Sequence, residues 1–250
     1  MQTAVTTDYN HIAAQYRKAK QQPWRSAVEE YSLLKLVGNL AGKKVIDIAC
    51  GEGFFTRKLK QRGAATVVGV DISREMVALA QAQEAQSPLG IEYLEEDARA
   101  AGPQQDFDLA VAAWLLVYAH DRDELAVMCR GLARRLKPGG RFATLTTNPH
   151  VYSFERLEYR KYGFDVRLED HVYEGATIVW TTYLDDSSFE IENYYLPIEA
   201  YESALREAGF RDVAFHQLEL APDAATAGQG DYWAEFLKHP PAIMIDAIKV

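Results

Sequence analysis

Residues 45–56 have the sequence VIDIACGEGFFT, in which a short apolar run with one aspartate precedes two closely spaced glycines and a pair of phenylalanines. This order predicts a strand, a tight turn and the first turn of a helix. Glycine has no Cβ, so Gly51 and Gly53 can take a positive φ and let a ligand approach the backbone. The helix that follows begins with unpaired N–H groups, which can face the same ligand. The stretch therefore predicts a ligand-binding loop between a strand and a helix.

Short apolar runs alternate with helical patterns on either side of this loop. We expect strands at residues 44–48, 66–70, 91–94, 109–113, 141–146, 212–220 and 242–250. Short polar side chains that can cap a first turn mark helix starts at Ser26, Ser73 and Asp121. Apolar strands that alternate with helices belong to a sheet covered on both sides. The sequence therefore predicts an α/β fold: a Rossmann-like, mostly parallel seven-stranded sheet with helices on both faces and an antiparallel C-terminal strand.

The chain changes character after residue 147. The segments 171–183 and 188–196 are rich in β-branched and aromatic residues and flank Asp185-Asp186-Ser187. Strand-forming runs on either side of a polar turn predict an antiparallel hairpin. A helix is expected to start at Pro197 and to end at Gly209, and a short aromatic helix is expected over 231–238. The sequence thus predicts an aromatic antiparallel insertion after the fifth strand of the main sheet.

The composition limits the classes of partner. The 250 residues are 48% hydrophobic and contain no run of about 18 apolar residues, so neither a membrane span nor a secretory signal is expected. The two cysteines, Cys50 and Cys129, have no metal-ligand spacing, so we expect no metal and a cytoplasmic location. The formal net charge of −9 repels a phosphate backbone, which makes a nucleic-acid partner unexpected.

Two carboxylates, Asp47 in the first expected strand and Asp71 at the end of the next one, narrow the choice of cofactor. Asp71 follows Gly51 by twenty residues and ends the next expected strand, where it can accept hydrogen bonds from ribose hydroxyls. A nicotinamide dinucleotide asks for a third glycine, and Thr56 stands there instead. Asp47 would repel a diphosphate but attract the ammonium and sulfonium of S-adenosylmethionine; alternatively it only caps the turn. The residues favour S-adenosylmethionine, and an NAD-dependent dehydrogenase is the weaker alternative.

Five segments in register resemble the class I S-adenosylmethionine-dependent methyltransferases. They are DIACGEG at 47–53, VVGVDIS at 67–73, LEEDA at 94–98, DFDLAVAAW at 106–114 and LKPGGR at 136–141. The chain is most similar to bacterial small-molecule methyltransferases, the toxoflavin-type N-methyltransferases among them, through ACGEGFF, VVGVDIS and AAWL. The resemblance covers about residues 9–146. It implies one methyltransferase domain, 1–250, with an N-terminal lid (1–25), a cofactor-binding core (26–147), an acceptor-pocket insertion (148–196) and a C-terminal helix and strands (197–250).

The resemblance also implies a set of cofactor-binding residues. They are Tyr16, Arg25, Asp47, Ala49, Gly51, Gly53, Asp71, Ile72, Met76, Asp97, Ala98 and Ala113. In this family Asp71 would bind the ribose diol, while Ile72 and Met76 would pack on the adenine. Asp97 and the Ala98 backbone N–H would contact the adenine edge. Arg25 is expected to pair with the cofactor's carboxylate, because a guanidinium binds a carboxylate through two parallel hydrogen bonds.

The acceptor is expected between the lid and the insertion. Tyr9, Trp114 and Trp180 are the expected contacts, and Tyr118, His120 and His150 are candidate bases, because they follow strands whose carboxyl ends face a ligand. The expected reaction is in-line displacement of a methyl group onto a nitrogen or oxygen of a small aromatic or heteroaromatic metabolite, leaving S-adenosylhomocysteine. A catalytically silent S-adenosylmethionine-binding module is the other alternative. The acceptor atom and the oligomeric state stay open.

Overall fold

The computed structural model describes residues 9–100, 105–151, 159–169, 171–225 and 230–250. Its main sheet has seven strands in the order β3-β2-β1-β4-β5-β10-β9. The strands are β1 (Lys44–Ile48), β2 (Thr66–Asp71), β3 (Glu92–Glu95), β4 (Phe107–Val111), β5 (Leu136–Thr147), β9 (Phe210–His216) and β10 (Ala242–Lys249). The first five pair in parallel, whereas β10 is antiparallel to β5 and β9. The predicted seven-stranded sheet with an antiparallel C-terminal strand is confirmed.

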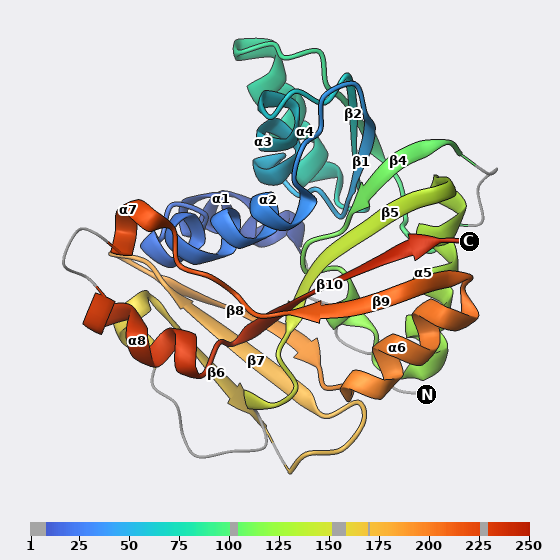
Figure 1. Cartoon of the computed structure of the whole chain (residues 1–250). Coiled ribbons are helices and arrows are strands. Elements are labelled where there is room, and N and C mark those ends of the chain that lie inside the picture. Colours follow the sequence, from blue (N-terminus) through green and yellow to red (C-terminus); the bar gives the residue numbers. More distant parts are fainter. Residues whose placement is uncertain (1–8, 101–104, 152–158, 170, 226–229) are drawn as a thin grey trace.

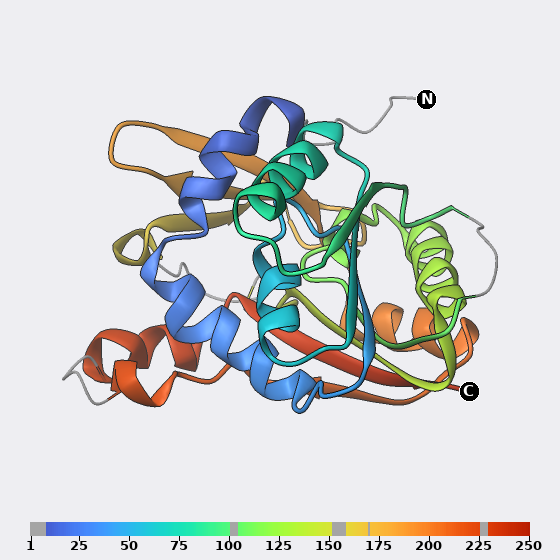
Figure 2. The same ribbon diagram turned by 90° about the horizontal axis from the view of Figure 1, so that it is seen from above.

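Helices cover both faces of this sheet (Figures 1 and 2). The α-helices of the chain are α1 (Tyr9–Ala19), α2 (Tyr31–Val37), α3 (Phe54–Gln61), α4 (Arg74–Gln86), α5 (Arg122–Arg135), α6 (Ile198–Glu207), α7 (Pro222–Ala224) and α8 (Gly230–Lys238), and α8 lies beside the second sheet rather than on the main one. The helices α2, α3 and α4 lie on one face, and α5 and α6 lie on the other. Each face buries its own apolar cluster, as alternating strands and helices require. None of the described helices is long and apolar enough to cross a membrane.

A second, three-stranded antiparallel sheet follows β5. It contains β6 (Phe164–Leu168), β7 (Thr177–Tyr183) and β8 (Ser188–Tyr194). The predicted hairpin is confirmed as β7–β8, although its first strand begins at Thr177 rather than at residue 171. The third strand, β6, was not predicted. Its Phe164 stacks on Trp180 of β7 with ring centroids 5.3 Å apart, so aromatic packing holds it.

Two predicted helix caps are confirmed and one is wrong. The Ser73 hydroxyl accepts a hydrogen bond from the Met76 N–H, and the Asp121 carboxylate accepts one from the Glu124 N–H. Ser26 caps nothing, because the helix has already begun at Pro23 and Ser26 lies inside a π-helical turn, Arg25–Glu30. The Ser26 hydroxyl donates instead to the Pro23 carbonyl at 3.2 Å. The π turn shifts the phase of the helix before α2 continues it.

Several boundaries also differ from the sequence prediction. Strand β4 ends at Val111, so Ala113 lies beyond it, where the chain leaves the sheet through Trp114. Strand β5 begins at Leu136 rather than at 141 and includes Pro138-Gly139-Gly140. Strand β9 covers Phe210–His216 rather than 212–220. These shifts move strand ends and leave the order of the elements unchanged.

Candidate active site

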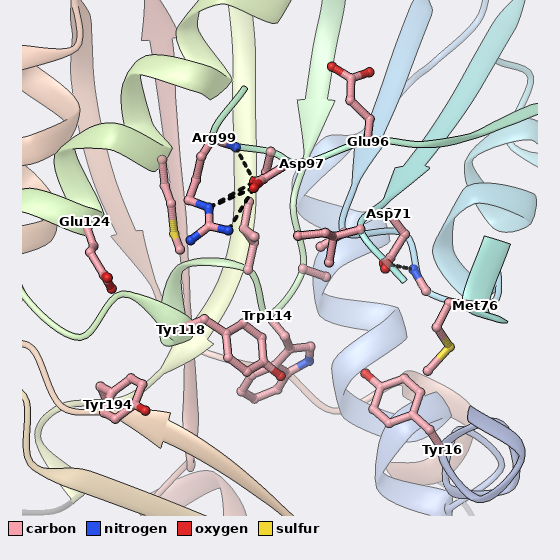
Figure 3. Close-up of a pocket in the computed structure, with 17 residues that line it drawn as sticks. Tyr16, Asp71, Met76, Glu96, Asp97, Arg99, Trp114, Tyr118, Glu124 and Tyr194 are labelled. Atoms are coloured by element: carbon pink, nitrogen blue, oxygen red, sulfur yellow. Dashed lines mark hydrogen bonds and ion pairs between the residues drawn. The ribbon is translucent and has the colours of Figure 1, made fainter. Parts of the chain in front are cut away.

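A cavity of about 210 Å³ opens at the carboxyl ends of β1, β2, β3 and β4. The strand order reverses between β1 and β4, and open α/β sheets bind ligands at such a point. The loops after these strands, α5, α1 and β8 all contribute to the wall. The lining residues are Tyr16, Ala49, Gly51, Asp71, Ile72, Met76, Glu96, Asp97, Ala98, Arg99, Ala113, Trp114, Leu115, Tyr118, Glu124, Met128 and Tyr194 (Figure 3).

The two glycines of the loop after β1 have different surroundings. Gly51 lines the cavity, with φ +56°, and a Cβ built on it would meet only the Tyr16 ring, at 3.9 Å. Gly53 caps α3 with φ +90°, and its Cβ would lie 2.6 Å from the Tyr93 hydroxyl. Gly53 is not among the lining residues. Gly51 thus keeps the cavity open, whereas Gly53 makes room for a buried tyrosine.

Asp71 ties the end of β2 to this loop. One carboxylate oxygen accepts from the Gly51 N–H and the other from the Ser73 N–H, both at 2.8 Å. Burial raises the pKa of Asp71, and the N–H donors partly offset that effect. The carboxylate lies at the cavity wall in Figure 3. A fixed, buried carboxylate at this position can accept hydrogen bonds from a pair of ligand hydroxyls.

The wall beyond Asp71 is apolar, and an ion pair ends it. Ile72 is 61% exposed although it lines the cavity, and Met76 beside it is buried. An exposed aliphatic side chain next to a cavity marks a surface that a flat ligand can cover. Asp97 accepts from the Arg99 guanidinium at 2.8 Å, which lowers the pKa of Asp97. Ala98 lies between them on the same wall.

Asp47 lies behind the loop, and the larger cavity does not reach it. Its carboxylate is 1% exposed and accepts from the Thr56 hydroxyl at 2.6 Å. Burial raises the pKa of Asp47 to about 7. Thr56, which stands where a dinucleotide site has its third glycine, is therefore the hydrogen-bond donor of Asp47. The carboxylate lines a hollow of about 20 Å³ together with Lys20, Gly51 and others.

Lys20 is a site residue that the sequence did not single out. Its ammonium lies over the rings of Tyr16, Phe54 and Phe55, at 5.0, 5.4 and 5.5 Å from their centroids, in the hollow beside Asp47. Its spacing of four residues from Tyr16 on a helix was a usable signal, because such residues share a face. Arg25, the expected carboxylate partner, contacts Glu29 instead, at 2.7 Å. Among the residues described as lining that hollow, Lys20 is the one with a cationic side chain.

A third hollow, of about 30 Å³, adjoins the aromatic sheet. It is lined by Tyr16, Arg25, Trp114, Val117, Tyr118, Trp180, Thr182, Ile191 and Asn193, and it shares Tyr16, Trp114 and Tyr118 with the large cavity. Trp114 has φ +66°, uncommon for a bulky residue, and its indole N–H donates to the Glu29 carboxylate. Glu29 is fully buried, and the sequence had not singled it out as a site residue.

The three candidate bases lie at different distances from these walls. Tyr118 lines both the large cavity and the third hollow. The His120 side chain is half exposed and packs edge-on against Tyr194, outside the lining. His150 is exposed, and its backbone N–H donates to the Asn148 side chain at 3.3 Å. The side chain of Tyr9 lies outside the described residues. Within the described part of the chain, no cluster of three or more metal-ligating side chains occurs.

Comparison with known proteins agrees with this architecture. Residues 45–140 match the family model of a methyltransferase domain. The ubiquinone biosynthesis O-methyltransferase of Pseudomonas fluorescens is 37% identical over 118 residues, which cover 46% of this chain and 50% of that protein. The N-demethylindolmycin N-methyltransferase of Streptomyces griseus is 26% identical over 181 residues, which cover 71% and 73% of the two chains. This chain thus spans about half the length of the ubiquinone-pathway relative.

Solved structures show the same fold. The crystal structure of an S-adenosylmethionine-dependent methyltransferase from Mesorhizobium loti superposes with a TM-score of 0.63 at 22% identity, covering 92% of this chain and all of that one. The glycine loop, the Asp71 strand end and the cavity at the strand-order reversal lie within or beside the region matched by the family model. Residues 45–140 therefore match a methyltransferase domain, and the chain has the fold of S-adenosylmethionine-dependent methyltransferases of known structure.

Proposed function

We propose that the whole protein transfers a methyl group from S-adenosylmethionine to a nitrogen or oxygen of a small, aromatic or heteroaromatic metabolite by in-line displacement. The observation that carries the proposal is a single cavity that joins the glycine loop, the Asp71 carboxylate and the aromatic side chains Tyr16, Trp114 and Tyr118. One cavity thus contains both a surface suited to a nucleoside, at the glycine loop and Asp71, and an aromatic surface. Methyl transfer needs both, because the donor and the acceptor must be held in line and away from water.

The described residues fit this cofactor. Asp71 would take the ribose hydroxyls, Ile72 and Met76 would cover one face of the adenine, and Asp97 with the Ala98 N–H would contact its edge. Gly51 leaves room at the loop, since no side chain but Tyr16 approaches its missing Cβ. When bound, the cofactor supplies a methyl group activated on a sulfonium.

The amino-acid end of the cofactor has a matching set of charges. Lys20 lies in the hollow beside the loop together with Asp47 and Glu52. We assign the carboxylate of the cofactor to Lys20 rather than to Arg25, because Lys20 lines the hollow beside the loop and lies 4.0 Å from Glu29, whereas Arg25 lies outside that lining and is in direct contact with Glu29 at 2.7 Å. Asp47 and Glu52 would attract the ammonium, and burial raises the pKa of both carboxyls. A bound cation would favour their ionised forms.

The acceptor proposal depends on the aromatic walls and the charge. The indole of Trp114 meets Trp180 edge to face at 5.3 Å, and both line the hollow next to the cofactor cavity. Aromatic walls suit a flat metabolite, while a net charge of −9 disfavours a nucleic-acid acceptor. Of the three candidate bases, we favour Tyr118, because it lines both the large cavity and the third hollow. His120 and His150 remain weaker candidates. Two free, buried cysteines support a reducing compartment, the cytoplasm.

The proposal is tested by comparing ligands and then measuring turnover. S-adenosylhomocysteine should raise the melting temperature and NAD should not, since mass action stabilises the state that binds. Tritiated S-adenosylmethionine is then offered with a panel of phenols, quinolones and azaheterocycles. Binding without transfer to any member would favour a silent cofactor-binding module. A shift with NAD alone would favour a dehydrogenase and end the proposal.

A further inference from the structure

Two of the described residues that line the 30 Å³ hollow beside the second sheet have buried donors without a hydrogen-bond partner. Among the described residues, five buried side-chain polar atoms have no hydrogen-bond partner, and two of them, Trp180 Nε1 and Arg25 Nε, belong to residues that line this hollow. The Trp180 side chain is 6% exposed and Arg25 is 7% exposed. An unsatisfied buried donor costs about 1–3 kcal/mol, so native proteins supply a partner for nearly all of them.

The volume of the hollow limits the size of the group that can bind these donors. A volume of about 30 Å³ has room for a substituent of one or two heavy atoms but not for an aromatic ring. Because Tyr16, Trp114 and Tyr118 form walls of both the hollow and the large cavity, a ring lying against them in the cavity can extend a substituent into the hollow. Figure 3 shows Trp114 and Tyr118 side by side at this end of the cavity.

The charges decide between a neutral and an anionic substituent. Arg25 is already paired with the Glu29 carboxylate at 2.7 Å, and Glu29 Oε2 is itself buried without a partner. The Glu29 carboxylate contacts two lining residues, Arg25 and Trp114, so a second carboxylate in the hollow would lie near it and be repelled by it. A neutral carbonyl oxygen, by contrast, can accept from the indole N–H without adding charge.

We propose that the acceptor is a flat ring bearing a neutral carbonyl group, and that Trp180 is a specificity-determining residue whose indole N–H donates to the carbonyl oxygen in this hollow. Arg25 supports the same oxygen from the helix that contains the π turn. The inference rests on the proposed methyltransferase function and narrows its substrate class. It predicts discrimination by one hydrogen bond between ligands of the same shape.

The test uses three probes on protein saturated with S-adenosylhomocysteine, whose binding is first measured by calorimetry. The probes are 1-indanone, which carries a ring ketone, indane, which has the same shape without the oxygen, and benzoate, which is anionic. Dissociation constants come from ligand-observed NMR. We expect 1-indanone to bind about 3- to 10-fold tighter than indane, the ratio expected for one neutral hydrogen bond, and tighter than benzoate.

Trp180→Phe keeps a ring against Phe164 and Trp114 but removes the donor, so the preference for 1-indanone over indane should disappear. Trp233→Phe is the matched control. Trp233 is also buried with an unpartnered indole N–H, but it stacks on Tyr162 and lines none of the three hollows. The Trp233→Phe variant should prefer 1-indanone over indane to the same extent as the unmodified protein. As a readout independent of Trp180→Phe, 1-indanone should shift the ¹H–¹⁵N indole signal of Trp180 in the unmodified protein and leave that of Trp233 in place.

Each outcome has one reading. Equal affinities of 1-indanone and indane, or a preference that survives Trp180→Phe, would overturn the role of the indole N–H. Tighter binding of benzoate would overturn the neutral carbonyl in favour of an anion. Failure of S-adenosylhomocysteine to bind at the outset would overturn the proposed function instead.

Discussion

At the scale of single residues, the buried carboxyl of Asp47 makes the free energy of unfolding depend on pH. The carboxyl is fully buried, accepts a hydrogen bond from Thr56, and has its pKa raised to about 7 by burial. Between pH 4 and 7 the folded chain holds a proton that the unfolded chain has released. Stability contributed by this proton is therefore lost as the pH rises through that window.

Asp47→Asn should remove this pH-dependent loss while keeping the Thr56 hydrogen bond. We expect the variant to gain stability relative to the parent as the pH rises from 5 to 8, by an amount on the order of 2–3 kcal/mol, because about two units of the shift in pKa fall within this range. Urea unfolding of both proteins without cofactor, at pH 5, 6.5 and 8, measures the difference. A difference that is constant across the three pH values would mean that Asp47 does not titrate in this range.

The two glycines of the loop should separate folding from binding. Gly53→Ala places a Cβ 2.6 Å from the Tyr93 hydroxyl at φ +90°, so we expect a loss of about 2 kcal/mol or more. Gly51→Ala has space around its Cβ and should cost only about 1 kcal/mol for its left-handed backbone. It should nevertheless weaken S-adenosylhomocysteine binding at least tenfold, because the methyl group enters the cavity wall. Urea unfolding and calorimetry on both variants would contradict this if Gly53→Ala were the milder change in stability.

At the scale of elements, the π-helical turn Arg25–Glu30 brings the N-terminal helix into the site. A π turn adds a residue to one turn, and such turns frequently mark functional positions. Here the turn contains both Arg25 and Glu29, and the Glu29 carboxylate also accepts from the indole of Trp114. One buried ion pair thus connects the helix to the chain leaving β4, where Trp114 has a left-handed backbone.

A double-mutant cycle measures this connection. Glu29→Gln leaves a buried guanidinium without its counter-ion, and we expect a loss of about 3 kcal/mol. Arg25→Met alone should cost less, because the Lys20 ammonium still lies 4.0 Å from Glu29. The double variant should lose clearly less than the sum of the single losses, with a coupling of about 1 kcal/mol or more. Additive losses in urea unfolding would show that the two side chains act independently.

The elements also show what local sequence can and cannot predict. Helix starts at Ser73 and Asp121 could be predicted because a cap is made by neighbours three residues apart. The Ser26 cap was wrong because Pro23 and Trp24 had already begun the helix. The π turn that follows contains Glu29, whose partner Trp114 is 85 residues away in the sequence. Strand β6 was missed because its five residues gain their partner only when Phe164 stacks on Trp180.

The same division applies to the candidate site. Positions after β1 to β4 could be placed together from sequence, because the carboxyl ends of parallel strands meet at one edge of a sheet. Glu29 and the third hollow could not, since they require the helix with the π turn, the chain after β4 and the second sheet to be assembled first. For Lys20 the sequence offered one signal, its spacing of four residues from Tyr16. The roles of all these residues toward a ligand stay predictions, as do the four segments assigned within the chain.

At the scale of the whole molecule, the cavity is a junction of distant parts of the chain. Its wall draws Tyr16 from α1, loop residues from four strands of the main sheet, and Tyr194 from the second sheet. The strands β10 and β9, at the other end of the sheet from β3, contribute no residue to its lining. A ligand in the cavity should therefore stabilise segments far apart in sequence and leave the opposite edge of the sheet unchanged.

Amide hydrogen exchange tests this arrangement in the intact protein. Saturating S-adenosylhomocysteine should slow exchange in α1, in the loop 49–53, and in residues 71–76, 96–99 and 113–118, with protection factors rising severalfold or more. The strands β9 and β10, whose amides are held in the sheet far from the cavity, serve as the internal control and should exchange at an unchanged rate. NAD at the same concentration should change none of these rates. Protection confined to the loops of the main sheet, with α1 unaffected, would show that the cofactor binds without the N-terminal helix and that neither Tyr16 nor Lys20 is part of the site.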